Sequence, residues 1–482
     1  MSQISMGSKF KQISLVLFGV MAGVLLSLNF SAVAQREEAR YPLPVDELRA
    51  FAEVYGAIKT GYVEPVEDKK LITEAINGML TGLDPHSAYL DQEAFKELQV
   101  GTQGEFGGLG IEVGMEDGFV KVVSPIEDTP AFRAGLKPGD LIIRLDDTPV
   151  KGMTLGDAVK RMRGKPKTPI RLTIVRKGES QPFEVTVVRD VIRVQSVKSK
   201  TIEPGYGYLR ISQFQEHTGE NMVNHLQELY KNGELKGLVL DLRNDPGGLL
   251  NGAVGVSAAF LPRDAIVVTT DGRTEDAKRK YTAAPGDYLR GRGDDYLKKL
   301  PAGVKSVPMV VLVNGGSASA SEIVAGALQD YKRATVMGTQ SFGKGSVQTI
   351  MPLNNSTAIK LTTARYFTPS GRSIQAKGIT PDVMVEEPGA PRDRIREADL
   401  IKHLEGTDEA AQDKSKEAPA AQPDKSGDSS GSAGPNNKPI ELGGPDDFQL
   451  KQALNQLKGL PVIAKLDTPA TQPGSVQAET KK

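Results

Sequence analysis

Three serines lie where a short apolar run meets a helical pattern. The run, Met309–Val313, is rich in β-branched residues and precedes Asn-Gly-Gly, so it predicts a buried strand that ends in a turn. Ser317, Ser319 and Ser321 follow, and apolar residues then recur at helical spacing. Serines are common helix N-caps. The same position gathers free N–H groups and the positive end of a helix dipole, which would stabilise an oxyanion. The residue types leave open which serine, if any, is a nucleophile.

A serine nucleophile needs a base. None of the chain's four histidines lies in the stretch that contains the serines, and the chain has no cysteine. Lys344 lies downstream, and no Asp or Glu occurs between Gly338 and Leu353. A lysine that is desolvated and far from carboxylates has a lowered pKa and can act as a base; the alternative is a solvated loop lysine. In an extended segment Lys344, Ser346 and Gln348 share one face, so Gln348 could hold the neutral amine by a hydrogen bond.

These residues resemble the C-terminal processing (tail-specific) serine proteases, which use a Ser-Lys dyad. The motifs that carry the resemblance are Ser317-Ala-Ser-Ala-Ser-Glu-Ile-Val, Phe342-Gly-Lys-Gly-Ser-Val-Gln, Asp241-Leu-Arg-Asn-Asp-Pro-Gly-Gly, Tyr366-Phe-Thr-Pro-Ser-Gly-Arg-Ser-Ile and Gly378-Ile-Thr-Pro-Asp. The resemblance implies that Ser319 is the nucleophile, that Lys344 is the general base, and that Gln348 orients the lysine. It also implies an oxyanion hole made by backbone N–H groups of Ala320 and of the turn that contains Gly247 and Gly248. Apart from the resemblance, the two glycines would be read as an ordinary turn.

Composition limits the other classes of function. The chain has 482 residues, more than one typical domain, and its 60 basic and 60 acidic residues leave no net charge to attract nucleic acid or anionic lipid. Without cysteine it can form no disulfide, zinc–thiolate or iron–sulfur site, which fits an oxidising compartment. The resemblance implies a mechanism that needs no metal and no other cofactor.

The N-terminus predicts export. Lys9 and Lys11 precede an apolar run, and the run is followed by Ala32-Val-Ala34 and a polar residue, which is the pattern of a secretory signal peptide with an Ala-x-Ala cleavage site. The alternative is an uncleaved membrane anchor, because Ile13–Ala34 is just long enough to span a bilayer at roughly 20 residues. Either interpretation places the bulk of the protein outside the cytoplasm, and we expect a periplasmic location.

The next segment, from Tyr41 to about Leu98, has apolar residues at helical spacing and predicts a pair of helices. Its motif Leu83-Asp-Pro-His86 also resembles the N-terminal segment of the family. His86 is the alternative base. A single histidine beside a proline turn is more often a hydrogen-bonding loop residue than a catalytic one.

Between residues 100 and 189 short strands alternate with glycine turns, and a helix is predicted from Leu155 to Met162. This arrangement resembles a PDZ domain. In that family a glycine loop binds the terminal carboxylate of a peptide, and the following strand pairs with the peptide by β-augmentation. The residues implied in peptide binding are Leu109, Gly110, Ile111, Val113, Leu155 and Met162. The alternative is that the glycines only make a turn.

From Gly207 to about Asp382 strands and helices alternate, which predicts an α/β core with helices on a mixed, largely parallel sheet. The charged stretch Asp271–Lys299 has few apolar residues, which show no clear period, and predicts an insertion or a flexible loop. Residues 405–446 are rich in Ala, Pro, Ser, Gly, Asp and Lys and predict disorder. A short amphipathic helix near Phe448–Leu457 is interpreted as an element for self-association or partner docking, or as a marginal helix without a role.

The predicted fold is therefore an α/β protease core with an inserted, mainly-β PDZ domain and an N-terminal helical segment. The predicted parts are a signal peptide at 1–34, the helical segment at 35–99, the PDZ domain at 100–190, the Ser-Lys protease core at 191–386, a disordered linker at 387–446 and a C-terminal tail with a short helix at 447–482.

Two other enzyme classes fit less well. Gly338-x-x-x-x-Gly343-Lys344 matches most of a phosphate-binding P-loop, but Gly345 replaces the Ser or Thr that would bind magnesium. A P-loop also needs a helix just after the lysine, and here the pattern predicts a strand. Metalloprotease chemistry would need a His-Glu-x-x-His motif, which the chain lacks.

The sequence thus predicts a periplasmic serine endopeptidase that recognises C-terminal tails through its PDZ domain and cleaves substrates through an acyl-enzyme. The alternative is a catalytically silent PDZ-containing scaffold that binds such tails. The expected partners are proteins or peptides with apolar C-termini and no nucleic acid. Membrane anchoring would follow if the signal stayed uncleaved, and a homo-oligomer or an activating partner protein is left open.

Overall fold

The computed structural model describes residues 44–126, 128–291, 293–387, 395–406 and 441–464. The predicted signal peptide and most of the predicted disordered linker lie outside these ranges, and for those residues both stay predictions. Disorder is wrong for the described part of the linker at 395–406, where Glu397 is buried in a short helical turn. The chain forms two compact units, Met1–Ala75 and Ile76–Lys482. Within the described ranges, no helix has the length and hydrophobicity needed to cross a membrane.

Helix α2 (Val45–Gly61) belongs to the first unit, and α3 (Asp68–Thr81) spans the boundary between the units. No residue of α2 is buried, although its apolar side chains recur at helical spacing; Phe51 is 48% exposed and Val54 60%. An amphipathic helix whose apolar face is uncovered is typical of a segment that binds a partner.

The second unit is built on a six-stranded sheet in the order β10-β11-β12-β15-β16-β19. The strands are β10 (Val197–Glu203), β11 (Tyr206–Ile211), β12 (Gly237–Asp241), β15 (Met309–Val313), β16 (Thr335–Gly338) and β19 (Val383–Met384). β10 and β11 are antiparallel and every other neighbouring pair is parallel. This arrangement confirms the prediction of a mixed, largely parallel sheet.

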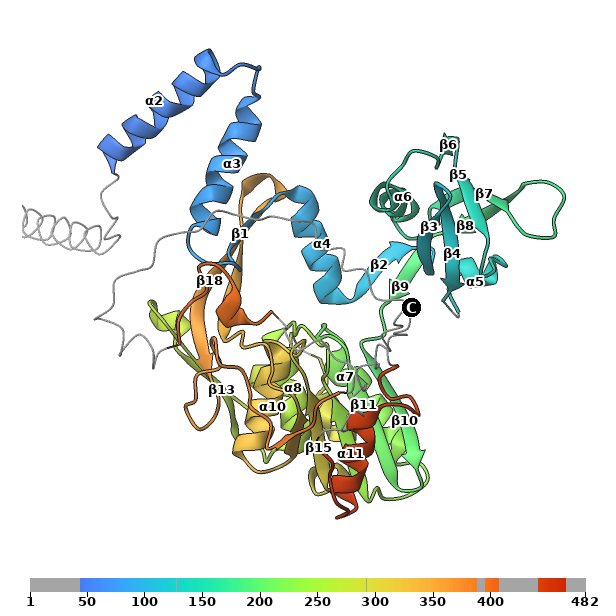
Figure 1. Ribbon diagram of the computed structural model, residues 1–482, viewed down its shortest axis with the longest axis vertical. Helices are drawn as coiled ribbons and strands as arrows, with labels where there is room; N and C mark the ends of the chain where they lie inside the picture. Colours follow the sequence, from blue (N-terminus) through green and yellow to red (C-terminus); the bar gives the residue numbers. More distant parts are fainter. Residues whose placement is uncertain (1–43, 127, 292, 388–394, 407–440, 465–482) are drawn as a thin grey trace, which may run out of the picture. The chain divides into compact units, whose positions relative to one another are not determined.

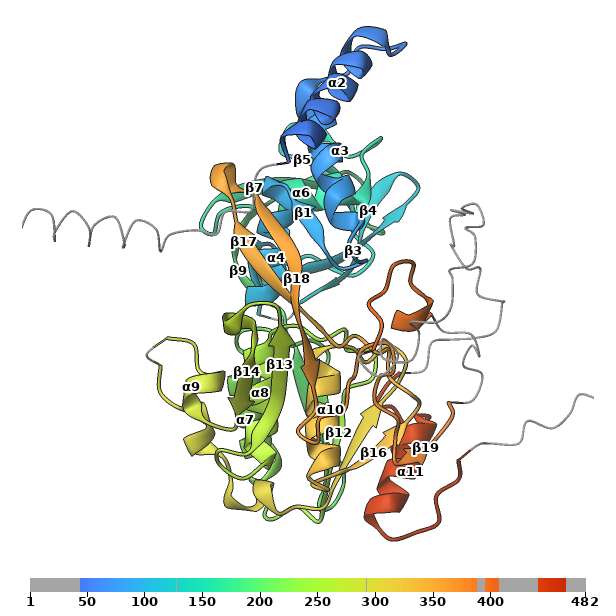
Figure 2. The same cartoon turned by 90° about the vertical axis from the view of Figure 1, so that its left-hand side faces the viewer.

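Helices cover both faces of this sheet (Figure 1). Those on the first face are α7 (Thr218–Leu229), α8 (Leu250–Phe260) and α10 (Ala320–Asp330). Alternation along β12 directs Leu238 and Leu240 to these helices, whereas Val239 packs with α11 (Phe448–Leu457) on the second face. All five residues of β12 and all five of β15 are therefore buried, which explains their continuous apolar runs. The interpretation of α11 as a marginal helix without a role is wrong, because it closes this face beside β16 and β19 (Figure 2).

A second sheet is entirely antiparallel. It consists of β1 (Ala88–Leu90), β18 (Ala358–Phe367), β13 (Ile266–Gly272) and β14 (Arg279–Thr282) in that order, with β17 (Ser346–Pro352) also paired to β18. The prediction of a loop over Asp271–Lys299 is wrong in its middle part. There β14 pairs with β13, and the short helix α9 (Pro285–Tyr288) buries the side chain of Tyr288.

Residues 111–188 form the predicted mainly-β PDZ domain, with its own hydrophobic core. Its sheet contains β3 (Ile111–Glu116), β4 (Phe119–Pro125), β5 (Leu141–Leu145), β6 (Thr148–Pro149), β7 (Pro169–Val175) and β8 (Phe183–Val188), and its helices are α5 (Pro130–Arg133) and α6 (Leu155–Met162). The chain enters and leaves through β2 (Glu105–Gly108) and β9 (Asp190–Arg193), which pair with each other. The domain is thus inserted between the helical segment and the core.

Candidate active site

Ser319 lies at the sharp turn between β15 and α10. Its backbone angles are φ 57° and ψ −111°, a region that non-glycine residues rarely adopt and that the surrounding structure must enforce. The neighbouring serines provide part of that constraint. Ser317 Oγ donates to the carbonyl of Leu242 at 2.8 Å, and Ser321 Oγ donates to the carbonyl of Asp245 at 2.9 Å. Two of the three candidate serines are thus buried and bonded to the backbone of the turn after β12.

The phenol of Tyr366 donates to the backbone carbonyl of Lys344, and the Ser319 hydroxyl is near enough to act on the pKa of the same phenol. The Lys344 amine has no hydrogen-bond or ion-pair partner among the described residues, and none joins it directly to the Ser319 hydroxyl. Catalytic hydrogen bonds are often long or absent in unliganded enzymes and form when substrate binds. The segments that carry the predicted nucleophile and base therefore lie at one site, beside Tyr366.

The environment of Lys344 favours a neutral amine. Burial lowers the pKa of Lys344 below its ordinary value, and the positive charge of Lys360 lowers it further. The carboxylates of Glu397, Glu322 and Asp84 act in the opposite direction, but the net change is downward. The absence of acidic residues next to Lys344 in sequence did not exclude them from the site, because all three come from distant segments. Burial is nevertheless the larger effect.

One buried carboxylate holds the two predicted catalytic segments together. Glu322 is fully buried, and its carboxylate accepts the backbone N–H of Ser319 at 2.8 Å, that of Gly343 at 2.7 Å and that of Lys344 at 3.0 Å. It also accepts the hydroxyl of Ser341 at 2.5 Å. Burial raises the pKa of Glu322 to about 7, although these donors favour the ionised form. This role of Glu322 was not predicted from the sequence, where the available signal was the capping-box spacing Ser319-x-x-Glu322.

A second buried carboxylate fastens the loop that carries the lysine. The backbone N–H of Glu397 donates to the carbonyl of Phe342 at 3.1 Å, and its carboxylate lies 2.8 Å from His86 Nε2. Gln375 Nε2 donates to the same carboxylate at 2.9 Å, while Gln375 Oε1 accepts the N–H of Gly345 at 2.9 Å. The ring of His86, considered as an alternative base, is thus engaged with Glu397. No local sequence signal indicated Glu397 or Gln375.

The turn Asn244–Gly248, called here the glycine turn, lies against the serine. A Cβ on Gly247 would be 2.8 Å from both the Cβ of Ser319 and the backbone nitrogen of Ala320. Gly247 and Gly248 have φ values of 96° and 144°, which side chains rarely permit. The N–H of Gly247 donates to Asp245 Oδ1 at 2.8 Å. Of the three predicted oxyanion donors, Gly248 and Ala320 keep N–H groups without an acceptor in the described part of the chain.

Gln348 lies on β17, but it does not contact the lysine by a hydrogen bond among the described residues. Its Nε2 donates to Ser346 Oγ at 3.0 Å and to Thr362 Oγ1 at 3.2 Å. Thr362 Oγ1 in turn donates to Asp84 Oδ1 at 3.1 Å. The side chain of Gln348 is therefore held by Ser346 and Thr362. Its predicted action on Lys344 stays a prediction.

Five of the six residues predicted to bind peptide, all except Gly110, belong to one apolar cluster in the PDZ domain. Leu109 and Met162 are buried in this cluster, whereas Ile111, Val113 and Leu155 are only partly buried. A Cβ on Gly110, whose φ is 77°, would lie 2.2 Å from the Cβ of Thr129, so the loop requires glycine at this position.

Comparison with known proteins gives the family of this site. The sequence model of peptidase family S41 matches residues 205–385, a PDZ domain model matches 107–187, and the model of the N-terminal domain of the activating protease CtpB matches 24–94. A carboxy-terminal-processing protease of Bartonella bacilliformis is 46% identical over 81% of this chain and 88% of its own length. The chain belongs to peptidase family S41.

A second curated relative and one solved structure are also similar to this chain. The carboxy-terminal processing protease CtpB of Bacillus subtilis is 35% identical over 77% of this chain and 76% of its own length. The solved structure of a photosystem II D1 C-terminal processing protease is 31% identical, with a TM-score of 0.40, and the match covers 71% of this chain and 88% of that one. The two family models and the Bartonella relative show that the chain is a serine-type peptidase with a PDZ domain.

The charge of Lys360 gives this S41 site a testable pH dependence. Removing that charge in Lys360→Met removes an interaction that lowers the pKa of Lys344. Because the base must be neutral to accept a proton, the acid limb of the kcat/KM profile should move to higher pH. The profile would be measured from about pH 6 to about pH 10, with the exposed Lys298→Met as the matched control. An unchanged limb, or one moved to lower pH, would contradict this account of Lys344.

Proposed function

We propose that this chain is a periplasmic serine endopeptidase that recognises the C-terminal tails of protein substrates through its PDZ domain and cleaves them through an acyl-enzyme. The observation that carries the proposal is the carboxylate of Glu322, which binds the backbone N–H groups of both Ser319 and Lys344. A single buried group thereby sets the separation of nucleophile and base. The names of the relatives, carboxy-terminal processing proteases, support the substrate class.

In the proposed reaction Ser319 Oγ turns towards Lys344 and attacks the substrate carbonyl. Its proton passes to the neutral lysine amine, and the oxyanion receives N–H groups of Ala320 and Gly248. Collapse of the tetrahedral intermediate breaks the C–N bond, and the lysine returns the proton to the leaving amine. Water then attacks the ester, gives its proton to the same lysine, and releases the new C-terminus together with free Ser319. Every proton that leaves an attacking group is thus returned to a leaving group.

Location and assembly are part of the proposal. The Lys-flanked apolar run with Ala32-Val-Ala34 supports export to the periplasm, with cleavage after Ala34 or retention as an anchor. The uncovered apolar face of α2, including Phe51 and Val54, supports a second copy or an activating protein as partner. The match of residues 24–94 to the N-terminal domain of an activating protease supports the same role.

Cleavage by the purified chain tests the proposal. A loosely folded substrate with an apolar C-terminus should be cut with a chelator present and without ATP, and Ser319→Ala should lose at least about 10³-fold in rate. Ser306→Ala, at an exposed serine, should keep full activity. Amidating the substrate's C-terminus should raise KM with little change in kcat, because it removes a binding contact distant from the cleaved bond. Tail binding without cleavage would instead support the scaffold function, and cleavage by Ser319→Ala would refute the mechanism.

A further inference from the structure

Helix α11 covers the second face of the six-stranded sheet and contributes buried side chains to the hydrophobic core there. Phe448, Leu450, Ala453 and Leu454 pack with strand residues such as Val310 on the second face of the six-stranded sheet. The described residues immediately before α11 are 441–447, and the chain between them and residue 406 lies outside the description. A segment far from the catalytic motifs in sequence therefore buries the sheet that positions them.

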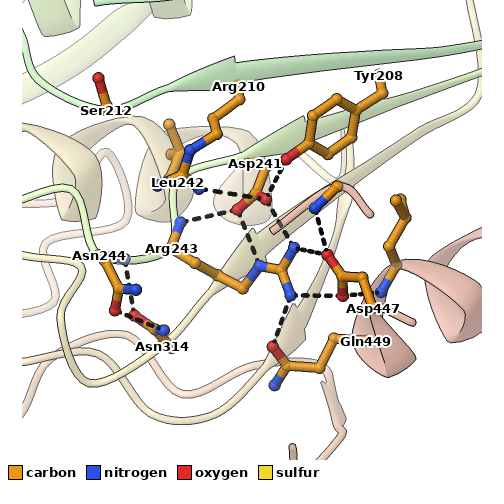
Figure 3. A network of polar contacts seen from close by, with 12 residues as sticks. Tyr208, Arg210, Ser212, Asp241, Leu242, Arg243, Asn244, Asn314, Asp447 and Gln449 are labelled. Atoms are coloured by element: carbon orange, nitrogen blue, oxygen red, sulfur yellow. Dashed lines mark hydrogen bonds and ion pairs between the residues drawn. The ribbon is translucent and has the colours of Figure 1, made fainter. Parts of the chain in front are cut away.

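The helix also brings acceptors to a buried arginine. Arg243, which follows β12, is 0% exposed, and its guanidinium has five N–H donors. Nε and Nη2 donate to the two carboxylate oxygens of Asp241 at 3.0 and 2.7 Å. Nη1 and Nη2 donate to Asp447 at 2.9 and 2.6 Å, and Nη1 also donates to Gln449 at 3.0 Å. All five donors are thus used, three of them by residues of the C-terminal segment (Figure 3).

Asp447 is itself fixed by the helix that it begins. It is fully buried, and its carboxylate accepts the N–H of Leu450 at 2.9 Å as an N-cap and the N–H of Gly443 at 2.7 Å. Gln449 Nε2 donates to the carbonyl of Val385 at 2.7 Å, just beyond β19. The acceptors that Arg243 meets are therefore rigid.

Arg243 is covalently joined to the glycine turn, since Asn244 is the next residue. Within that turn Asn244, Gly247 and Gly248 all have positive φ values, of 54°, 96° and 144°. Such a backbone persists only when its surroundings over-determine it. Ser317 binds the carbonyl of Leu242, just before Arg243, and Ser321 binds the carbonyl of Asp245 inside the turn. Arg243 lies between these two contacts and adds a further anchor at the strand end.

We propose that Asp447 is a positioning residue for the glycine turn and that cleavage requires residues 441–464 to be docked. Without its carboxylate, a fully buried guanidinium would keep donors that no acceptor satisfies, and the end of β12 would shift to relieve them. Oxyanion donors tolerate little displacement, since a misplacement of about 1 Å can cost about 10²-fold in rate. The expected loss of cleavage rate rests on the proposed function. The expected displacement of the glycine turn does not.

The test compares Asp447→Asn with Asp446→Asn, its exposed neighbour, in the full-length chain. The amide of Asp447→Asn keeps one acceptor oxygen and points an NH₂ group at Arg243. We expect kcat on a short peptide to fall by about 10- to 100-fold with KM nearly unchanged, and Asp446→Asn to behave as the parent. Hydrogen exchange of residues 244–248 should accelerate at least about tenfold, while that of α7 stays unchanged.

These two readouts separate the inference from the proposed function. Faster exchange confined to 244–248 supports the positioning role even if the parent cleaves nothing, a result that would refute only the protease assignment. Unchanged exchange in Asp447→Asn, or an unchanged kcat in an active parent, would overturn the inference. If Asp447→Asn does not fold, Gln449→Leu removes a single Arg243 acceptor and should show the same two effects at about three- to tenfold; parent-like behaviour would then be the contrary result.

Discussion

Lys344→Ala should lower kcat by about 10³-fold or more, and the double variant Ser319→Ala/Lys344→Ala should be no slower than either single variant. A serine hydroxyl is a weak nucleophile until a base removes its proton, and base catalysis contributes about 10² to 10⁴ in rate. Groups that act as one unit are strongly non-additive, because removing the second costs little once the first is gone. Single-turnover rates on one peptide, for the parent and all three variants, measure both statements.

The control is Lys298→Ala, at an exposed lysine outside the site, which should leave kcat unchanged. If the two single losses multiplied in the double variant, Ser319 and Lys344 would be acting independently. If instead Lys344→Ala kept most of the parent rate, another group would have to serve as base. His86 would be unsuited to that role as long as its ring stays bonded to Glu397.

Local signals in the sequence predicted the catalytic segments better than they predicted the residues that hold those segments in place. The strand Met309–Val313, the helix that follows it and the glycines of Gly247-Gly248 were all predicted, because hydrophobic periodicity and positive-φ turns leave traces within a few residues. The mixed sheet followed from the alternation of elements along the chain. The family resemblance selected Ser319 among three serines, a choice for which residue types gave no basis.

Contacts between residues that are far apart in the sequence were not predicted. Glu322 reads locally as a helix-capping residue, and nothing near it in sequence shows that it also binds the N–H groups of Gly343 and Lys344. The strand β14 was missed because only its pairing to β13 stabilises it, and its own apolar residues are few. The amphipathic pattern of α11 gave a correct helix, but a pattern does not state which surface the apolar face covers.

Glu322→Ala should both destabilise the fold and abolish catalysis. The substitution leaves four donors without their acceptor, those of Ser319, Ser341, Gly343 and Lys344, two of them buried and two partly buried. Breaking a buried polar network in this way costs about 3 to 5 kcal/mol of the free energy of unfolding. Because the same carboxylate sets the distance between nucleophile and base, we expect kcat to fall by at least about 10²-fold in the fraction that stays folded. Denaturant unfolding and peptide cleavage measure the two effects.

Glu322→Gln separates the charge of this residue from its shape. Burial raises the pKa of Glu322 from 4.5 to about 7. A carboxyl whose pKa is higher in the folded state stabilises the native protein while it is protonated, and that contribution is lost as pH rises from about 4.5 towards 7. The parent should therefore lose up to about 3 kcal/mol over this window relative to Glu322→Gln, which cannot ionise. Asp245, whose pKa burial also raises to about 7, is present in both proteins and cancels in the comparison. Parallel stability curves would show that Glu322 does not titrate in this range, and that its carboxylate holds the site in one ionisation state throughout.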